Sequence, residues 1–374
     1  MPKSQIKINY EAIKQNCLKL KELNPQTLIG ACLKAKAYSH NLLKTAKTLH
    51  ETVDYYLVGT ANEAVKLADK FPNKPILILY TFNQKDLSKI CNYPNIELSI
   101  YSTKVLEQVI SFSKSFNNSF KIHLNIDTGM HCLGLDYDQK TLEQVIKMLK
   151  HSQKINLTGV YTHLATADEE DTSYYYEQLE NFKNSLRFLE ANGLKPKLIH
   201  YQNTAGFIRQ DALDIKDLDV LNYQNMARLG IGIYGYYPSS QIEAIAIKNK
   251  LKKLTPSLVW YAYIDNIKQL KKGNSISYGQ AFICSQETTI ATIPIGYSDG
   301  FARRLSNVGQ VMIKGQIFQV IGRVRMNMIA IDITKANNPI KIGQKVDLIN
   351  SQITADKLAT IGETINYEIL TNLK

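Results

Sequence analysis

The amino-terminal two-thirds of the chain repeats one unit, and this repetition limits the possible folds more than any other feature. Each unit is a short apolar run, then a polar turn, then an amphipathic stretch with helical spacing. Strands that alternate with helices predict a parallel sheet, and the eight runs found here are the number that closes a (β/α)8 barrel of the TIM type. The eight predicted strands are Leu28–Leu33, Tyr55–Gly59, Pro75–Tyr80, Ile96–Tyr101, Phe120–Ile126, Leu157–His163, Leu198–Gln202 and Ala227–Gly235.

Helical patterns lie between these runs, and an opening helix precedes the first of them. The predicted helices include Tyr10–Leu23, Ala61–Lys70, Lys104–Ser113, Thr141–His151 and Tyr174–Glu190. After about residue 240 the rhythm changes, because short Gly, Asn and Lys turns separate the apolar runs and no long helical pattern occurs before Ala355–Ile361. The predicted strands there are Ser257–Ile267, Thr288–Pro294, Gln310–Ile313, Phe318–Gly322, Met328–Ile333 and Lys345–Ile349.

This change of rhythm divides the chain. We expect an α/β barrel over residues 1–240, followed by a mostly antiparallel β domain over residues 241–374. The boundary falls between Pro238 and Pro256.

Composition excludes several classes of protein. No apolar stretch approaches the roughly 20 residues that cross a bilayer, and Met1–Tyr10 lacks the apolar core of a secretion signal, so we expect a cytoplasmic protein without a membrane segment. The net charge of +12 is spread along the chain without a nucleic-acid-binding motif, so no nucleic-acid partner is expected. Five scattered cysteines without a C-x-x-C pair argue against a disulfide framework and against a metal site.

In such a barrel, the functional groups lie at the carboxyl ends of the strands and in the loops that follow. Lys34 follows the first predicted strand, and a lysine at a buried strand end can form a Schiff base once desolvation lowers its pKa. Lys36 competes for this role on spacing alone. Asp127–Cys132 and Asn203-Thr204 follow two other strands, His163 ends a third, and the last predicted strand carries Arg228–Ile231.

The last two predicted strands carry groups that suit a phosphate. Thr204 supplies a hydroxyl, and Gly230-Ile231 can supply backbone N–H groups. Three of the candidate residues also have a purely structural interpretation. Thr204 can cap a helix, Arg228 can form a buried ion pair, and His163 can be a core histidine whose ring nitrogens are hydrogen-bonded.

Several motifs together resemble one enzyme family. The segment Leu33–His40 (LKAKAYSH) resembles the V-K-A-N-A-Y-G-H signature around the cofactor lysine of alanine racemases. Further matches follow in the family's order: DTGM at 127–130, THLATAD at 162–168, NTA at 203–205, RLGI at 228–231 with Tyr234-Gly235, SYG at 277–279, GYSDG at 296–300, GRV at 322–324 and NYE at 366–368. The resemblance spans nearly the whole chain.

The resemblance implies a pyridoxal-phosphate-dependent racemase that interconverts L- and D-alanine, a small amino acid, with two bases. Lys34 would carry the cofactor and act as one base, and Tyr278 from the partner subunit of a homodimer would be the other. The remaining cofactor-binding residues would be Tyr38, Asn203, Thr204, Gly230, Ile231 and Tyr367 around the phosphate and Arg228, supported by His163, at the pyridine nitrogen. The substrate-binding residues would be Cys132, Tyr297, Arg325 and Met326.

Four positions depart from the family pattern. Cys132 stands where the family has an arginine that assists the catalytic tyrosine and the substrate carboxylate, and Asn125 where many members have a lysine that orients this arginine. Arg325-Met326-Asn327 replaces Cys-Met-Asp or Ser-Met-Asp, and Lys36 replaces an asparagine. Arg325 either binds the carboxylate in place of the family's arginine or lies on a strand surface.

Four alternatives compete with racemisation of alanine. A basic amino acid decarboxylase of the same architecture needs a Cys-Asp pair in the second domain, but Cys284 is followed by Ser285. A non-catalytic cofactor carrier resembles the barrel alone. A weakly active homologue, or a racemase of another small amino acid, remains an alternative because the departures fall on the substrate side. Nucleic-acid binding rests only on net charge.

Overall fold

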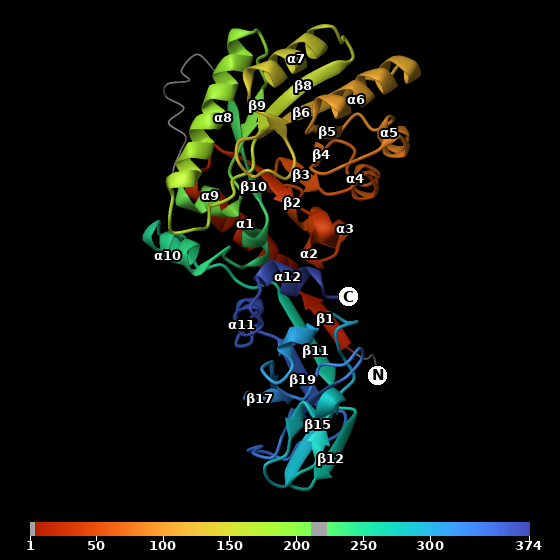
Figure 1. Ribbon diagram of the computed structural model, residues 1–374, viewed down its shortest axis with the longest axis vertical. Helices are drawn as coiled ribbons and strands as arrows, with labels where there is room; N and C mark the ends of the chain where they lie inside the picture. Colours follow the sequence, from red (N-terminus) through yellow and green to blue (C-terminus); the bar gives the residue numbers. More distant parts are fainter. Residues whose placement is uncertain (1–3, 211–222) are drawn as a thin grey trace. The chain divides into compact units, whose positions relative to one another are not determined.

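The computed structural model describes residues 4–210 and 223–374. The described residues form two compact units (Figure 1). The barrel unit comprises Glu11–Ala37 and Asn41–Thr255, and the β unit comprises residues 4–10, Tyr38–His40 and Pro256–Lys374.

The barrel unit contains a closed ring of parallel strands. The ring closes because β5 pairs with β4 on one side and with β6 on the other. A two-residue strand, β7 (Leu135–Asp136), adds to β6 outside the ring. The eight strands of the ring, in spatial order, are β2 (Leu28–Cys32), β3 (Tyr55–Val58), β4 (Ile76–Ile78), β5 (Ile96–Ile100), β6 (Phe120–Asp127), β8 (Ile155–Tyr161), β9 (Leu198–His200) and β10 (Gln224–Leu229). The predicted (β/α)8 barrel is confirmed.

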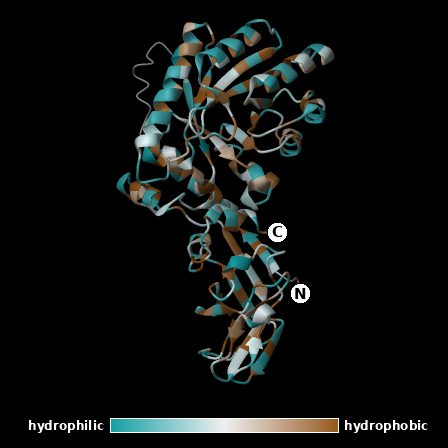
Figure 2. Cartoon of the chain, in the orientation of Figure 1, coloured by the Kyte–Doolittle hydropathy of each residue, from teal (hydrophilic) through white to brown (hydrophobic). Residues whose placement is uncertain are grey.

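Helices follow the strands and cover the ring. Figure 2 shows apolar colour along the barrel strands and alternating apolar and polar colour along the surrounding helices. This alternation is typical of amphipathic helices that pack one face on a barrel. The helices are α1 (Tyr10–Leu23), α2 (Lys34–Tyr38), α3 (Leu42–Leu49), α4 (Ala61–Ala68), α5 (Gln84–Ile90), α6 (Thr103–Phe116), α7 (Gln139–Lys150), α8 (Ser173–Ala191), α9 (Thr204–Arg209) and α10 (Ser240–Lys248).

The β unit is built on an eight-stranded sheet whose neighbouring strands pair antiparallel, as predicted. Its order is β1 (Ser4–Ile8), β11 (Leu258–Tyr263), β19 (Lys345–Ile349), β16 (Gln310–Ile313), β17 (Gln316–Ile321), β18 (Ile329–Asp332), β15 (Thr288–Ile293) and β12 (Asn266–Leu270). A two-stranded hairpin of β13 (Ser275–Ile276) and β14 (Phe282–Ile283) and helices α11 (Ala355–Ile361) and α12 (Asn366–Thr371) complete it. The first strand of the chain thus belongs to the second sheet, which the sequence pattern did not predict.

Two predicted strands differ from the structure. The run Ala227–Gly235 contains β10 and then a 3₁₀ helix, η2 (Ile231–Tyr234), because the backbone leaves the extended conformation at Gly230. The run Ser257–Ile267 turns at Ile264-Asp265 and divides into β11 and β12, since β11 pairs with β19 whereas β12 pairs with β15. Both corners carry residues that favour a break, Gly230 in the first run and Asp265-Asn266 in the second, and the predicted strands extended through them.

Candidate active site

Lys34 follows the first strand of the ring, at its carboxyl end. The Leu33 N–H donates to the Leu57 carbonyl at 2.7 Å, which continues the pairing of the strands up to this point. The Lys34 side chain is partly buried, and its Nζ donates to the Tyr80 hydroxyl at 2.6 Å. Lys36, the competing lysine, is exposed. The geometry therefore favours Lys34 over Lys36 for a reaction inside the barrel.

The segment after Lys34 is a left-handed turn. Ala35, Lys36, Ala37, Tyr38 and Ser39 all have φ between 54° and 64°. A left-handed helical conformation costs roughly 1–2 kcal/mol per L-residue, so the surrounding structure must stabilise it. The Ala37 N–H donates to the Leu33 carbonyl at 2.8 Å, and the Lys36 N–H donates to the Glu63 carboxylate at 3.2 Å.

The loops after β9 and β10 form a close backbone cradle. The Gly230 N–H donates to the Thr204 hydroxyl at 3.0 Å, and a Cβ built on Gly232 would lie 2.8 Å from Thr204 Cγ2. Ile231 and Gly232 begin η2, so their N–H groups have no acceptor within that helix. A hydroxyl beside N–H groups without an acceptor can donate hydrogen bonds to the oxygen atoms of a phosphate. Asn203 instead caps α9, since its Oδ1 accepts from the Gly206 N–H at 2.9 Å.

Arg228 is buried inside the barrel near the end of β10. Its Nη1 donates to the His200 carbonyl at 2.7 Å, and its Nη2 donates to the Thr162 carbonyl at 2.8 Å. Arg228 Nη2 also lies 3.2 Å from His163 Nδ1, so the structure brings these two predicted residues together. Burial lowers the pKa of Arg228, and the guanidinium nevertheless stays charged at neutral pH, as arginine does in proteins. Within residues 4–210 and 223–374, Arg228 forms no ion pair, contrary to the structural alternative.

Both histidines next to Arg228 accept its hydrogen bonds as neutral imidazoles. Burial and the charge of Arg228 lower the pKa of His200 well below its usual value. Close packing of protein atoms around the imidazole, together with the charges of Arg228 and Lys34, lowers the pKa of His163, although the residue as a whole is exposed. His200 was not predicted as a site residue, because it lies within a strand rather than after one.

The loop after β6 is held by two buried amides. Asn125 donates from Nδ2 to the Leu133 carbonyl at 3.0 Å, and Cys132 is exposed in the loop thus closed. Gln178 of α8 donates to the His163 carbonyl at 3.1 Å and to the Thr128 hydroxyl at 3.3 Å, and it accepts from the Ala165 N–H at 2.8 Å. Gln178 therefore joins the loops after β6 and β8, a role that no motif predicted.

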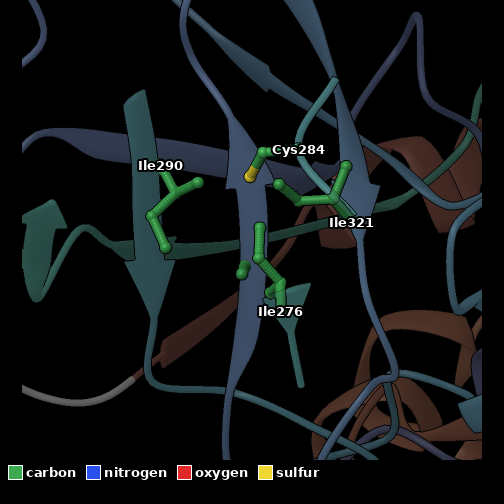
Figure 3. Close-up of a cluster of buried hydrophobic side chains, with 5 residues drawn as sticks. Ile276, Cys284, Ile290 and Ile321 are labelled. Atoms are coloured by element: carbon green, nitrogen blue, oxygen red, sulfur yellow. The ribbon is translucent and has the colours of Figure 1, made fainter. Parts of the chain in front are cut away.

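In the β unit, a small hairpin presents Tyr278. This tyrosine lies between β13 and β14 and is 69% exposed. Figure 3 shows the buried cluster beneath the hairpin, in which Ile276 and Cys284 pack against Ile290, Ile321 and Ala330. Ser277 Oγ donates to the Arg323 carbonyl at 2.8 Å, and a Cβ on Gly279 would lie 3.3 Å from the Arg323 guanidinium. A cation thus lies beside the residue that follows Tyr278.

Two interlocked turns carry the predicted substrate-binding residues of the β unit. The Tyr297 N–H donates to the Arg325 carbonyl at 3.2 Å, and the Ser298 N–H donates to the Met326 carbonyl at 3.0 Å. A Cβ on Gly296 would lie 2.0 Å from the Arg325 carbonyl oxygen, so only glycine fits there. Tyr297 and Met326 are exposed, and Arg325 is partly exposed.

Tyr38 and Tyr367 meet in the same unit. Their ring centroids are 6.1 Å apart at 49°. Ser39 Oγ donates to the Leu373 carbonyl at 3.0 Å, which ties the segment after Tyr38 to the end of α12. The predicted residues therefore form two sets, one in each unit.

Comparison with known proteins identifies the family. Residues 8–238 match the family model "Alanine racemase, N-terminal domain", and residues 257–374 match "Alanine racemase, C-terminal domain". The chain belongs to the alanine racemase family. It is thereby an enzyme of the isomerase class, as predicted, and the alternative of a carrier that resembles the barrel alone does not account for the second match.

Full-length relatives agree with this assignment to the alanine racemase family. An alanine racemase of Carboxydothermus hydrogenoformans is 33% identical over 374 residues, covering 98% of this chain and 96% of the relative. Alanine racemase 2 of Bacillus subtilis is 34% identical over 377 residues, covering 98% and 92%. The solved structure of an alanine racemase of Clostridium difficile is 32% identical, with a TM-score of 0.89 and coverage of 100% and 94%.

Two other solved alanine racemases hold ligands. The Bacillus anthracis enzyme with bound L-Ala-P is 31% identical, with a TM-score of 0.89 and coverage of 100% and 93%. The Bartonella henselae enzyme with covalently bound pyridoxal phosphate is 27% identical, with a TM-score of 0.85 and coverage of 100% and 98%. Among the described residues of the present family member, no helix is both long enough and apolar enough to span a bilayer.

Proposed function

We propose that this chain interconverts L- and D-alanine with pyridoxal phosphate bound to Lys34. The observation that carries the proposal is the full-length similarity to alanine racemases, joined to a partly buried lysine at the carboxyl end of the first barrel strand. Thr204 and the N–H groups at the start of η2 bind the phosphate in this proposal, with Tyr38 and Tyr367 as further donors. Asn203 acts indirectly by capping α9.

When bound, pyridoxal phosphate withdraws electrons and makes the α-hydrogen of an amino acid acidic. Inversion at Cα needs a proton removed from one face and returned on the other, so two bases are required. Lys34 Nζ serves one face and the hydroxyl of Tyr278 serves the other, with Arg323 as a cation near Tyr278. Arg228 would hold the pyridine nitrogen by donating a hydrogen bond while keeping its own proton, which would restrain side reactions of the cofactor.

The proposed functional form is a homodimer in which the β unit of each subunit completes the other subunit's site. The exposure of Tyr278 in the single chain supports this arrangement. Met326 supplies a backbone N–H for the substrate carboxylate, Arg325 adds a cation, and Tyr297 and Cys132 line the substrate side. The five free cysteines are in keeping with a reducing compartment, the cytoplasm.

A racemisation assay with separate substrates tests the proposal. The purified chain with pyridoxal phosphate is mixed with L-alanine, L-serine or L-lysine, and optical rotation and carbon dioxide release are followed. We expect loss of rotation with L-alanine and no gas. Gas from L-lysine would indicate the decarboxylase alternative, and loss of rotation with L-serine alone would assign another small amino acid.

A second measurement tests whether the cofactor is bound to Lys34. Reduction of the bound cofactor with borohydride followed by peptide mapping should label Lys34. The Lys36→Ala variant is the matched control and should label normally, whereas label on Lys36 would overturn the assignment.

A further inference from the structure

Four buried polar side chains form a continuous line of hydrogen bonds inside the barrel. His123 Nε2 lies 2.6 Å from Glu97 Oε2, and His123 Nδ1 lies 2.8 Å from His200 Nε2. His200 Nδ1 lies 3.0 Å from Arg228 Nη1. Glu97 is the second residue of β5, whereas Arg228 comes next to last in β10, so the line runs from the barrel interior toward its mouth. We call these four residues the buried relay.

The chemistry of Arg228 fixes every proton in the buried relay. A guanidinium only donates hydrogen bonds, so His200 Nδ1 must accept and the proton of His200 lies on Nε2. His200 Nε2 then donates to His123 Nδ1, which places the proton of His123 on Nε2. His123 Nε2 donates in turn to the Glu97 carboxylate. Both imidazoles are neutral, and every bond points from Arg228 to Glu97.

The barrel is shaped around this line. The strand β8 lies between the strands of His123 and His200, and a Cβ built on Gly159 of β8 would lie 2.3 Å from His123 Nδ1. The missing side chain lets the two histidines meet across the strand. Tyr161 stacks on the His200 ring, with centroids 4.5 Å apart at 12°.

Two unlike charges end the buried relay, and each lacks a direct partner of opposite charge among the described residues. Glu97 is 1% exposed, and its carboxylate contacts His123, which is neutral here. Arg228 is held by carbonyls and imidazoles. A buried charge is costly unless it is balanced, and polarised hydrogen bonds connect the two charges at low dielectric.

The phenols and the thiol beside the buried relay are neutral at neutral pH. Tyr55 packs edge-on against His123, and burial together with the charges of Glu97 and Asp54 raises the pKa of its phenol. Burial raises the pKa of Tyr161 to about 12 and also raises the pKa of Cys32. None of these groups can replace Glu97 as the counter-charge of Arg228 at neutral pH.

We propose that Glu97 and His123 are positioning residues for the active site, which act through His200 to fix and balance the Arg228 guanidinium. This inference rests on the proposed function in one respect, because the contact of Arg228 with the pyridine nitrogen of the cofactor belongs to that proposal. Neither Glu97 nor His123 touches the substrate or the cofactor in this scheme. Removing the charge of Glu97 leaves the interior with net positive charge, which disfavours protonation of the bound cofactor.

The first test uses the unmodified full chain without cofactor. The seven histidines are labelled with ¹⁵N in the imidazole ring and assigned with single His→Asn variants. We expect His123 and His200 to be neutral with the proton on Nε2 at neutral and mildly alkaline pH. If either His123 or His200 is an imidazolium, or carries its proton on Nδ1, the proposed direction of the hydrogen bonds in the buried relay is wrong. This result does not depend on catalysis.

The second test compares Glu97→Gln with Ser99→Ala in the loaded enzyme. Glutamine keeps an acceptor oxygen for His123 but removes the charge. Ser99, also buried in β5, accepts from Tyr161 at 2.9 Å and controls for loss of a hydrogen bond. We expect the pH midpoint of the bound cofactor's visible absorbance to fall by about one unit in Glu97→Gln only, as a charge removed from a poorly screened interior requires.

The two proposals fail in distinguishable ways. An unchanged midpoint in a folded Glu97→Gln variant overturns the role of Glu97, even if the chain racemises alanine. If His123 and His200 have the predicted tautomers but the chain does not racemise alanine, the buried relay stands and the proposed function is overturned. If Glu97→Gln does not fold, the tautomers of the unmodified chain decide the matter.

Discussion

The carboxylate of Glu63 accepts a hydrogen bond from the backbone N–H of Lys36, two residues beyond the proposed cofactor lysine. The same carboxylate accepts from the Gly59 and Thr60 N–H groups at 3.1 Å and 3.2 Å, which completes the capping box of α4. One side chain therefore ends a barrel strand, starts a helix and stabilises the left-handed turn after Lys34.

Replacing Glu63 should weaken cofactor retention as well as the fold. We expect Glu63→Ala to lower the free energy of unfolding by roughly 1–3 kcal/mol, as removal of a cap and a turn hydrogen bond predicts. Asp86→Ala is the matched control, because it breaks the capping box of α5 alone. Equilibrium dialysis of pyridoxal phosphate should show weaker binding only for Glu63→Ala; equal affinities would refute the role in the turn.

Gln178 should be intolerant of an apolar replacement of similar size. Gln178→Leu removes the partner of the Ala165 N–H and of the His163 carbonyl, whereas the Thr128 hydroxyl keeps its hydrogen bond to Thr162, so we expect a loss of roughly 1–3 kcal/mol of unfolding free energy in urea. The exposed Gln139, which contacts only Glu143, provides the control Gln139→Leu with little change. A similar small effect of both substitutions would mean that the loops after β6 and β8 are held by other contacts.

An active site shared between subunits, as proposed above, predicts complementation between two inactive variants. Lys34→Ala and Tyr278→Phe should each lose nearly all activity alone. Statistical mixing into dimers restores about one site in four, because half of the dimers are mixed and each mixed dimer has one intact site. Mixing after mild dissociation and assaying D-alanine measures this. Absence of recovery, with mixed dimers detected by mass spectrometry, would rule out a shared site.

Arg325 should contribute to substrate binding if it takes the role of the arginine that the family has at the position of Cys132. We expect Arg325→Ala to raise KM for alanine roughly tenfold, since a charge-assisted hydrogen bond to a carboxylate is removed. Arg187→Ala, on the surface of α8, is the control. If KM and kcat both stay unchanged, Arg325 is a surface arginine and the carboxylate is held by other groups.

His200 should make the fold sensitive to acid. Because burial lowers the pKa of His200 in the folded state, the unfolded chain binds a proton near pH 6.5 that the folded chain does not. Its contribution to stability is present above that pH and falls by roughly 1.4 kcal/mol per pH unit below it. Urea unfolding between about pH 7.5 and 5 should therefore show a shallower pH dependence for His200→Asn. If the unfolding free energy of the unmodified chain and of His200→Asn changes equally with pH, this role of His200 is contradicted.

The barrel was predictable because its strands and helices carry a clear period. The bounds of the helices Tyr10–Leu23 and Ala355–Ile361 and of the strand Gln310–Ile313 agree with the prediction. The left-handed turn was not predictable, since Ala35 to Ser39 contain no glycine and local preference opposes this conformation. Tertiary contacts, above all that of Glu63, determine it.

Candidate site residues were predicted where a family motif or a strand end marks them, and not where they lie within a strand without a motif. Lys34, Arg228 and Thr204 were found from strand ends and motifs. Glu97, His123 and His200 lie inside apolar runs, where the only signal is a polar residue that a strand would otherwise exclude. Contact among these side chains depends on the order of the strands and on the space left by the missing side chain of Gly159. A single sequence gives neither.

The pairing of β1 with β11 has a consequence for how the chain is made. Ser4–Ile8 leaves the ribosome about 250 residues before its partner strand Leu258–Tyr263, a separation that favours slow closure. The intervening barrel can form first, while the opening strand keeps its backbone donors and acceptors unsatisfied by any sheet. A fusion or truncation at the amino terminus should therefore disturb assembly of the last third of the chain before it disturbs the barrel to which it is nearest in sequence.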